Sequence, residues 1–429
     1  MSGAGSPGEA ARPGGATRRG ALAALLPRSA SRDAPVLLLT RALRGFADGF
    51  VSVLLVAYLL TLGYSDLQIG ALVTGTLFGS AALTLFVGLR GARLSRRRVL
   101  LGASALMAAT GLGFAGLTDF WPLLVVGFAG TLNPSSGDVS VFLPTEQALL
   151  SETVAPRDRT AIFARFTLAG ALAGAFGALA SGLPSVIAEA RGWEVEPLQR
   201  AGFLLYAAVA VANACLYRTL SPAVELDQAS IPTRALATSR PIVLRLSALF
   251  SLDSFGGGFV VQSLLVLWLY KRFGLSEETA AAIFFAVGTL QAFSQLVSSW
   301  LAARIGLINT MVYTHLPANV FLMLAALMPN APLAVAFLLL RTSLSQMDVP
   351  ARQSYVMAVV PPEERPAAAS VTNVPRSLAA ALPPFLAGAM LAHSSFGWPL
   401  ILAGLLKAIY DILLWLQFRA VRPPEERGA

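Results

Sequence analysis

Long apolar stretches, separated by short polar connections, recur along almost the whole chain. A helix needs about 20 apolar residues to cross a hydrocarbon core about 30 Å thick. Many stretches reach that length, and the connections between them are too short to form soluble domains. The pattern predicts an all-α integral membrane protein with twelve transmembrane helices, at residues 35–62, 66–89, 99–118, 121–149, 159–183, 200–219, 241–270, 278–301, 308–328, 332–357, 367–392 and 399–419.

The composition also indicates a protein surrounded mostly by lipid. Hydrophobic residues make up 55% of the chain, charged residues only 13%, and the mean hydropathy is +0.67. A soluble domain carries about 25% charged residues. One cysteine, Cys215, and two histidines are too few for a disulfide framework or a histidine-built metal site. We therefore expect no cofactor and no metal.

The basic residues lie at the ends of the apolar stretches. This placement argues against nucleic-acid binding despite a net charge of +9, and it indicates orientation instead, because loops rich in Lys and Arg stay in the cytoplasm. With the N-terminus inside, twenty basic residues fall on the inner side and four on the outer side. Both termini are therefore expected to be cytoplasmic. Abundant Arg, Ala, Gly and Pro are typical of a bacterial gene of high GC content, so the expected location is the bacterial cytoplasmic membrane.

The two halves of the chain repeat each other. Residues 145–161 align with residues 351–367 at a constant offset of 206, and Asp138 aligns with Asp348 at an offset of 210. Two parallel halves of six helices are one of the repeat arrangements found in transporters. The expected domains are a disordered cytoplasmic tail (1–34), an N-terminal lobe (35–219), a cytoplasmic linker (220–240), a C-terminal lobe (241–419) and a cytoplasmic tail (420–429).

The stretch after the second predicted helix carries a family motif. It reads Gly88-Leu-Arg-Gly-Ala92-Arg93-Leu-Ser95-Arg96-Arg97-Arg98. In this stretch the chain resembles the major facilitator superfamily, whose signature here is a glycine, an acid, a second glycine and several basic residues. The basic residues are present, whereas the acid is replaced by Ala92 and the second glycine by Ser95. The resemblance covers about residues 35–420.

The resemblance implies two six-helix lobes that rock about a central cavity and move a solute by alternating access. The family arginine of helix four is absent, with Thr131 near its place, and Arg341 holds the repeat-equivalent position in helix ten. Gly170, Gly174 and Gly177 in helix five are similar to the glycine-rich antiporter motif but lack its proline. Gating or interlobe contacts are expected from residues at the cytoplasmic helix ends, namely Arg93, Arg96, Arg304, Glu146, Arg159 and Arg365.

Charged residues inside the first predicted helix share one face. Arg41, Arg44 and Asp48 are spaced i, i+3 and i+7. Charges at membrane depth are costly, so they usually face a cavity and often mark a transport pathway. Asp48 is expected near the midplane, as a candidate for proton coupling. The alternative is that Arg44 and Asp48 only pair with each other and hold the helix in place.

The fourth and tenth predicted helices carry matching polar stripes. The tenth has Arg341, Ser345, Asp348 and Arg352, and the fourth has Thr131, Ser135 and Asp138. A polar stripe on an apolar membrane helix faces water or protein rather than lipid. We expect Asp138, Arg341 and Asp348 to line the cavity, although an internal lattice of ion pairs would give the same pattern.

Three further helices contribute candidates. Asp253, in helix seven, precedes Gly256-Gly257-Gly258, a run that permits bending. Asn373 and Arg376 lie in helix eleven, and Arg376 has no acid within its own helix. It is expected either to pair with an acid across the cavity or to bind an anionic substrate. His315, in helix nine, is expected to be a packing residue.

Three function classes fit a membrane protein of this kind: a secondary transporter, a lipid-modifying enzyme, and a receptor or structural protein. We find no histidine–acid motif, metal-ligand spacing or nucleotide-binding loop, which argues against an enzyme and against ATP coupling. The repeat and the paired polar stripes argue against a receptor. We therefore expect a monomeric transporter that binds a small-molecule substrate and protons in the lipid bilayer. By family analogy the expected activity is proton-coupled efflux as an antiporter, and the alternative is proton-coupled uptake or exchange of a small organic anion.

Overall fold

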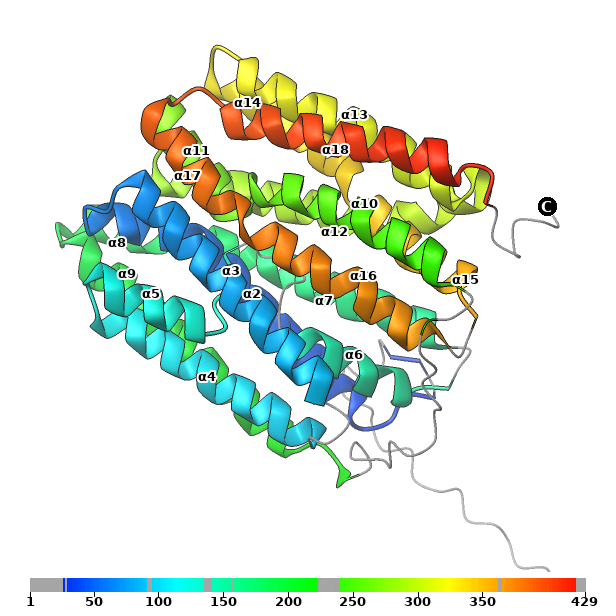
Figure 1. Cartoon of the computed structure of the whole chain (residues 1–429). Coiled ribbons are helices and arrows are strands. Elements are labelled where there is room, and N and C mark those ends of the chain that lie inside the picture. Colours follow the sequence, from blue (N-terminus) through cyan, green and yellow to red (C-terminus); the bar gives the residue numbers. More distant parts are fainter. Residues whose placement is uncertain are drawn as a thin grey trace, which may run out of the picture.

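The computed structural model describes residues 26–27, 29–90, 95–134, 141–155, 158–222, 236, 239–361 and 364–421, and within these ranges the regular structure is helical (Figure 1). Asp138 and Arg93 lie outside the described residues. The helices are α2 (Ala34–Thr61), α3 (Asp66–Arg90), α4 (Arg96–Gly116), α5 (Phe120–Ala129), α6 (Phe142–Glu152), α7 (Arg159–Ala180), α8 (Leu183–Arg191), α9 (Val195–Arg218), α10 (Arg240–Gly258), α11 (Gln262–Phe273), α12 (Glu277–Ile305), α13 (Leu307–Leu327), α14 (Ala331–Ser345), α15 (Asp348–Val359), α16 (Arg365–Ala381), α17 (Pro383–His393) and α18 (Trp398–Phe418).

Ten helical segments in the described part of the chain are long and apolar enough to cross a membrane. The all-helical membrane architecture is therefore confirmed, whereas the count of twelve stays a prediction. The difference lies in the fourth and tenth predicted helices, which were expected to be continuous. The fourth is divided into α5 and α6, and the tenth into α14 and α15.

Glycine and proline account for other breaks. The seventh predicted helix was expected to be continuous, but the glycine run 256–258, which permits bending, ends α10, and α11 begins at Gln262 after a short turn. A second break separates α16 from α17 at Leu382, directly before Pro383. Proline lacks the N–H that would continue the helical hydrogen bonds and clashes with the preceding turn.

Helix packing follows the same scheme in the two halves. In the first half α2 packs against α7 and α9, α4 packs against α9, and α3 packs against α5. In the second half α10 packs against α16 and α18, α13 against α18, and α12 against α14. The halves meet where α7 contacts α12 and where α3 contacts α16 and α17 (Figure 1). The exact lobe and linker boundaries stay a prediction.

Glycines bring α2 and α7 into backbone contact. A Cβ atom at Gly45 would overlap the carbonyl oxygen of Gly170, and one at Gly49 would overlap the carbonyl oxygen of Gly174. A Cβ atom at Gly177 would overlap the carbonyl oxygen of Phe46. Small residues permit such close approach between membrane helices. The glycines that resemble the antiporter motif therefore form a packing surface for α2.

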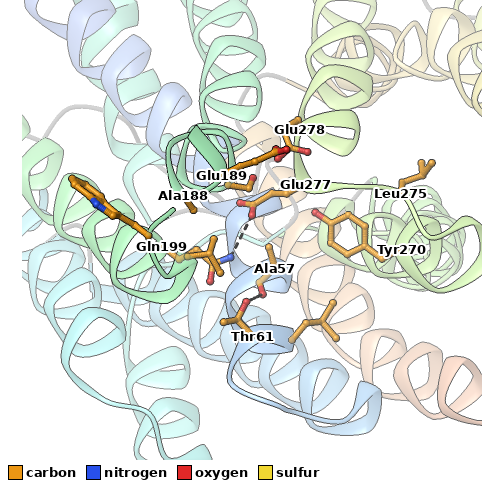
Figure 2. Close-up of a pocket in the computed structure, with 13 residues that line it drawn as sticks. Ala57, Thr61, Ala188, Glu189, Gln199, Tyr270, Leu275, Glu277 and Glu278 are labelled. Carbon is orange, nitrogen blue, oxygen red and sulfur yellow. Dashed lines mark hydrogen bonds between the residues drawn. The ribbon is translucent and has the colours of Figure 1, made fainter. Parts of the chain in front are cut away.

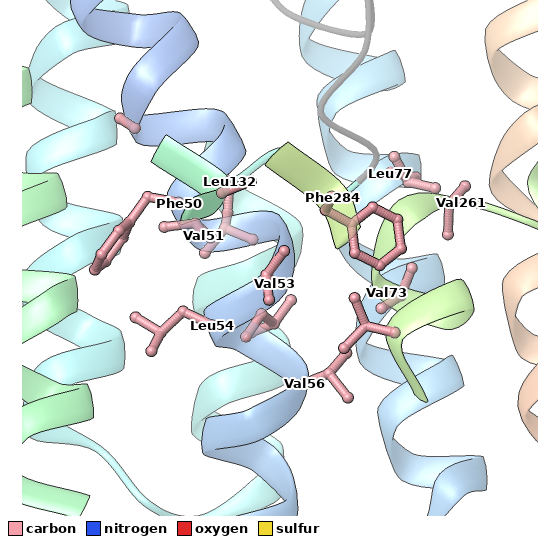
Figure 3. Close-up of a cluster of buried hydrophobic side chains, with 14 of the residues drawn as sticks. Phe50, Val51, Val53, Leu54, Val56, Val73, Leu77, Leu132, Val261 and Phe284 are labelled. Atoms are coloured by element: carbon pink, nitrogen blue, oxygen red, sulfur yellow. The ribbon is translucent and has the colours of Figure 1, made fainter. Parts of the chain in front are cut away.

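The contacts between described residues differ between the predicted outer and inner ends of the molecule. At the predicted outer end, where α2 ends and α3 begins, apolar side chains of both halves pack together, including Val56, Val73, Val261 and Phe284 (Figure 3). There Lys271 of α11 forms an ion pair with Asp66 of α3. At the predicted inner end, the described polar contacts include several that join residues of the same half. Examples are Arg96–Glu152, Asp33–Ser221 and Ser239–Glu364.

Candidate functional site

A buried ion pair joins α2 to α6 in the first half. Arg44 is 1% exposed and forms an ion pair with Glu146, which is fully buried. The Tyr217 hydroxyl donates a hydrogen bond to Glu146 at 2.5 Å, and the Thr40 hydroxyl donates another at 3.2 Å. The Arg44 guanidinium also lies 4.4 Å from the centre of the Phe142 ring. These contacts give the buried ion pair the additional hydrogen bonds and ring contact that such a pair needs.

Asp48 lies one turn beyond Arg44 on the same helix and is 8% exposed. It makes no ion pair with any described residue, and Asn133 lies beside its carboxylate. The alternative in which Arg44 and Asp48 pair with each other is therefore not what the structure shows, because Arg44 binds Glu146 instead.

A second charged cluster surrounds Asp253 on α10. One carboxylate oxygen lies 2.6 Å from Lys407 Nζ of α18, and the other lies 3.1 Å from a guanidinium nitrogen of Arg352 on α15. Arg352 also lies 3.5 Å from Asp348 on its own helix. All four residues are at most 7% exposed. This cluster ties three helices of the second half together.

His315 of α13 extends this cluster. Its Nδ1 lies 2.9 Å from Asp411 of α18, and its Nε2 lies 3.8 Å from Asp253. The Asn319 amide donates to Asp411 at 2.8 Å. His315 was expected to be a packing residue. It is buried, but it also bridges two carboxylates, which makes it a titratable link within the cluster.

The two clusters use repeat-related positions with opposite charges. Glu146 and Arg352 occupy equivalent places at the offset of 206. In the first half an arginine of the first helix binds a glutamate of the fourth, and in the second half an aspartate of the seventh helix binds an arginine of the tenth. In each half an ion pair therefore attaches the first helix to the second segment of the divided helix, α6 or α15. The basic and acidic partners exchange places between the two halves.

Polar atoms without partners lie on α14 and before α6. Arg341 Nε, Ser345 Oγ and Thr131 Oγ1 are buried and have no hydrogen-bond partner among the described residues. Arg341 was expected to share a face with Asp348, but Asp348 instead pairs with Arg352 across the break between α14 and α15. Buried polar atoms are usually satisfied by protein or water. These three positions are therefore available to water or to a solute.

Helix α16 brings its arginine close to the second cluster. Arg376 Nε donates a hydrogen bond to Ser254 Oγ at 2.9 Å, and Ser254 is the neighbour of Asp253. Asn373, one turn earlier, is exposed. The structure therefore places Arg376 beside the acid cluster of α10 and leaves Asn373 at the surface of this half.

Comparison with known proteins agrees with this arrangement of helices. The sequence model of the Major Facilitator Superfamily matches residues 37–347. The chain belongs to this superfamily. An uncharacterized membrane protein of the yeast Saccharomyces cerevisiae, YJR124C, is 27% identical, with 92% of this chain and 96% of the relative covered.

Solved transporters of the same fold superpose well on this superfamily member. A D-xylose–proton symporter covers 92% of this chain and 99% of its own length, with a TM-score of 0.70 and 16% identity. A bacterial homologue of the human lysosomal transporter Spinster, in an inward-facing and occupied conformation, covers 91% of this chain and 97% of its own, with a TM-score of 0.70 and 15% identity. The nucleoside transporter NupG covers 91% and 99%, with a TM-score of 0.66 and 15% identity. At these identities the likeness shows the fold, and together with the family it indicates a transporter.

The expected interlobe contacts take a different form in this superfamily member. Glu146 was expected at a cytoplasmic helix end as a gating or interlobe residue, and it is fully buried within the first half. Arg96 pairs with Glu152 of the same half at 2.7 Å, and the Arg304 guanidinium lies 4.1 Å from the Trp300 ring on its own helix. Arg93 and the side chains of Arg159 and Arg365 lie outside the described part of the structure.

Sequence reasoning missed two charged residues of the superfamily fold that matter here. Lys407 and Asp411 stand one turn apart inside the last apolar stretch, where a charge is costly. The same signal that selected Asp48 and Asp253 was available for them. Tyr217 was also missed, and no sequence signal pointed to it, because its role depends on α9 packing beside α6.

Proposed function

We propose that this chain is a secondary active transporter that moves a small solute across a membrane by alternating access, coupled to protons through Asp48. The proposal rests on the unequal surroundings of the buried acids. Asp253 is neutralised by two cations and Glu146 by Arg44, whereas Asp48 has no ion pair among the described residues. A buried carboxylate without a counter-ion is costly to keep charged. A proton is the simplest ligand that removes this cost.

Binding and release of that proton would follow the alternation of the two halves. When the midplane is open to water, the Asp48 carboxylate is solvated and can exchange its proton. When it is closed, as the 8% exposure of Asp48 indicates for this conformation, the neutral form is favoured. The contacts that join the halves at the predicted outer end support assigning this conformation to an outward-closed state.

The substrate path would pass between the charged clusters. Arg341, Ser345 and Thr131 have buried polar atoms without partners, which supports a role in contacting solute or water. Asp253, Asp348 and Arg376 would then shape the charge of the path from the second half. Export by proton antiport and a bacterial cytoplasmic membrane stay predictions from the sequence.

Transport by the purified protein in proteoliposomes tests the proposal. The wild type and Asp48→Asn are compared for uptake and release of a panel of anionic, neutral and cationic solutes, with and without an imposed pH gradient. We expect gradient-driven transport to fall to the level of empty liposomes in Asp48→Asn, because the amide cannot bind a proton reversibly. Exchange of solute without a gradient should persist, since the solute path is unchanged.

A matched control separates proton coupling from general damage. Asp119→Asn makes the same chemical change at an exposed position before α5, and it should transport like the wild type. Wild-type response to the pH gradient in Asp48→Asn would remove Asp48 from the coupling mechanism. Absence of transport for every solute in the wild type would argue against the transporter proposal itself.

A further inference from the structure

A pocket that no part of the proposed transport path uses lies at the predicted outer end (Figure 2). It has a volume of about 480 Å³ and is open to its surroundings. Its walls come from α2, α8 and α9 of the first half and from α11 and α12 of the second half. The volume falls within the range of small-molecule sites, about 300–1,000 Å³. A molecule bound here would touch both halves at once.

The charge of the pocket is negative. Glu189, Glu277 and Glu278 line it, and none of the lining residues is basic. Basic residues near it in the sequence have other contacts. Arg200 pairs with Glu196 at 2.8 Å, and Lys271 pairs with Asp66.

Unpartnered polar atoms at the centre of the pocket point to a ligand. Gln199 is 1% exposed, and its amide nitrogen donates to Glu277 at 3.3 Å, a contact drawn in Figure 2. The other amide atom, Gln199 Oε1, is buried without a hydrogen-bond partner among the described residues, and so are Glu277 Oε1 and the Tyr270 hydroxyl. Gln199 Oε1 can only accept hydrogen bonds, and so can Glu277 Oε1 when the carboxyl group is ionised. A ligand that satisfies them must donate hydrogen bonds.

Aromatic and apolar side chains complete the walls. Tyr270 lines the pocket, and aromatic ring faces attract cations. Trp193 lines it as well, and the guanidinium of Arg191 already lies 5.6 Å from the centre of its ring. Leu60 and Leu275 add apolar surface beside the acids. An ammonium group with N–H donors matches the carboxylates, the Gln199 amide oxygen and the Tyr270 ring, and an apolar substituent matches the leucines. A quaternary ammonium matches the charge but has no N–H to give.

We propose that this outer pocket is a binding site for a primary ammonium group, centred on Glu277, Gln199 and Tyr270. The site is separate from the charged clusters at membrane depth and does not depend on proton coupling through Asp48. Because both halves contribute to it, an occupied pocket would stabilise the outward-closed arrangement over any conformation in which the halves separate at this end.

Direct binding to the purified full-length protein tests the site. Phenethylamine, phenethyltrimethylammonium and phenethyl alcohol share one ring and differ in charge and in N–H donors. Isothermal titration without any gradient should show phenethylamine binding most tightly, the quaternary compound more weakly, and the alcohol not at all. Glu277→Gln should weaken phenethylamine binding by about tenfold or more, since charge-assisted hydrogen bonds are about twice as strong as neutral ones.

Glu194→Gln is the matched control, because Glu194 directly precedes α9, is exposed and does not line the pocket. It should bind phenethylamine like the wild type. If Glu277→Gln does not fold, Tyr270→Phe removes one unpartnered atom and should also weaken the binding of phenethylamine. Equal affinity of wild type and Glu277→Gln, equal affinity for the amine and the alcohol, or no binding of phenethylamine to the wild type would each overturn the proposal.

The same chemistry occurs free in solution and on a lipid headgroup. The titration is therefore repeated in nanodiscs of phosphatidylcholine with and without phosphatidylethanolamine. Competition by phosphatidylethanolamine would assign the site to a lipid ammonium group, and unchanged binding would assign it to a soluble amine. Either result supports recognition of an ammonium group, and neither depends on whether Asp48 couples transport to protons.

Discussion

At the residue scale, the interior carries charged side chains in groups whose members belong to different helices. Arg44 on α2 binds Glu146 on α6, and Asp253 on α10 binds Arg352 on α15 and Lys407 on α18. Desolvating two charges is expensive, and their mutual attraction repays this cost only when the geometry is good. Such pairs are therefore attachments between helices that weaken sharply when one partner is removed.

Replacement of Glu146 tests this reading. Glu146→Ala removes the carboxylate that pairs with Arg44, a residue that is only 1% exposed. Breaking a buried ion pair in this way lowers the free energy of unfolding by about 3–5 kcal/mol. We expect a large fall in the melting temperature, measured in detergent by tryptophan fluorescence. The double variant Arg44→Met with Glu146→Leu replaces the pair by apolar groups and should recover much of the loss. If Glu146→Ala melted like the wild type, the pair would not be a structural attachment.

At the element scale, glycine and proline decide where helices break and where they touch. Glycines 256–258 end α10, and Pro383 begins α17. On α2 and α7 the same residue type has another effect, because Gly45, Gly49 and Gly174 let the two backbones meet. Helices in a bilayer associate largely through such close packing, because lipid tails are as apolar as the helix side chains and the hydrophobic effect does not drive the helices together.

Gly49→Ala tests the contact of α2 with α7. Its Cβ would overlap the carbonyl oxygen of Gly174, which cannot move without the helix, so the two helices must separate. Overpacking of this kind costs about 1–3 kcal/mol, and we expect a lower melting temperature. Gly102→Ala on α4 is the matched control, because its Cβ would meet nothing within 4 Å. A control that loses as much stability as Gly49→Ala would contradict the packing argument.

At the scale of the whole molecule, the two ends have different compositions. The helix ends near Arg96, Arg218 and Arg240 carry the excess of basic residues, and the ends near Asp66 and Glu277 carry the acidic pocket and few basic residues. Positive loops stay in the cytoplasm. The basic end is therefore predicted to be cytoplasmic and the pocket end to face outward.

Single cysteines at exposed positions test this orientation. Cys215, which is exposed, is first replaced by serine. Glu194→Cys, before α9, should react with a membrane-impermeant maleimide in intact cells, and Arg98→Cys, in the first turn of α4, only after permeabilisation; both residues are exposed. Glu194 is preferred to Gly192, whose positive φ of 64° disfavours other residues. Labelling of Arg98→Cys in intact cells would reverse the orientation.

The sequence by itself determined the all-helical membrane fold and the family, and its glycine run marked a place in the seventh predicted helix where bending is permitted. These follow from local properties: the length of an apolar stretch, the conformational freedom of glycine, and a motif of neighbouring residues. It also selected Arg44, Asp48, Asp253, Arg341, Asp348 and Arg376 as buried charges, because a charge inside an apolar stretch is visible without a structure.

Only the tertiary structure decided which charges meet. Glu146 is distant from Arg44 in the chain and looked like a helix-end residue, yet the packing of α6 beside α2 buries it against Arg44. Lys407 reaches Asp253 because α18 packs on α10, and His315 reaches Asp411 because α13 packs on α18. Contacts between distant segments depend on how helices fit together in space, and a linear pattern of apolar and polar residues does not contain that information.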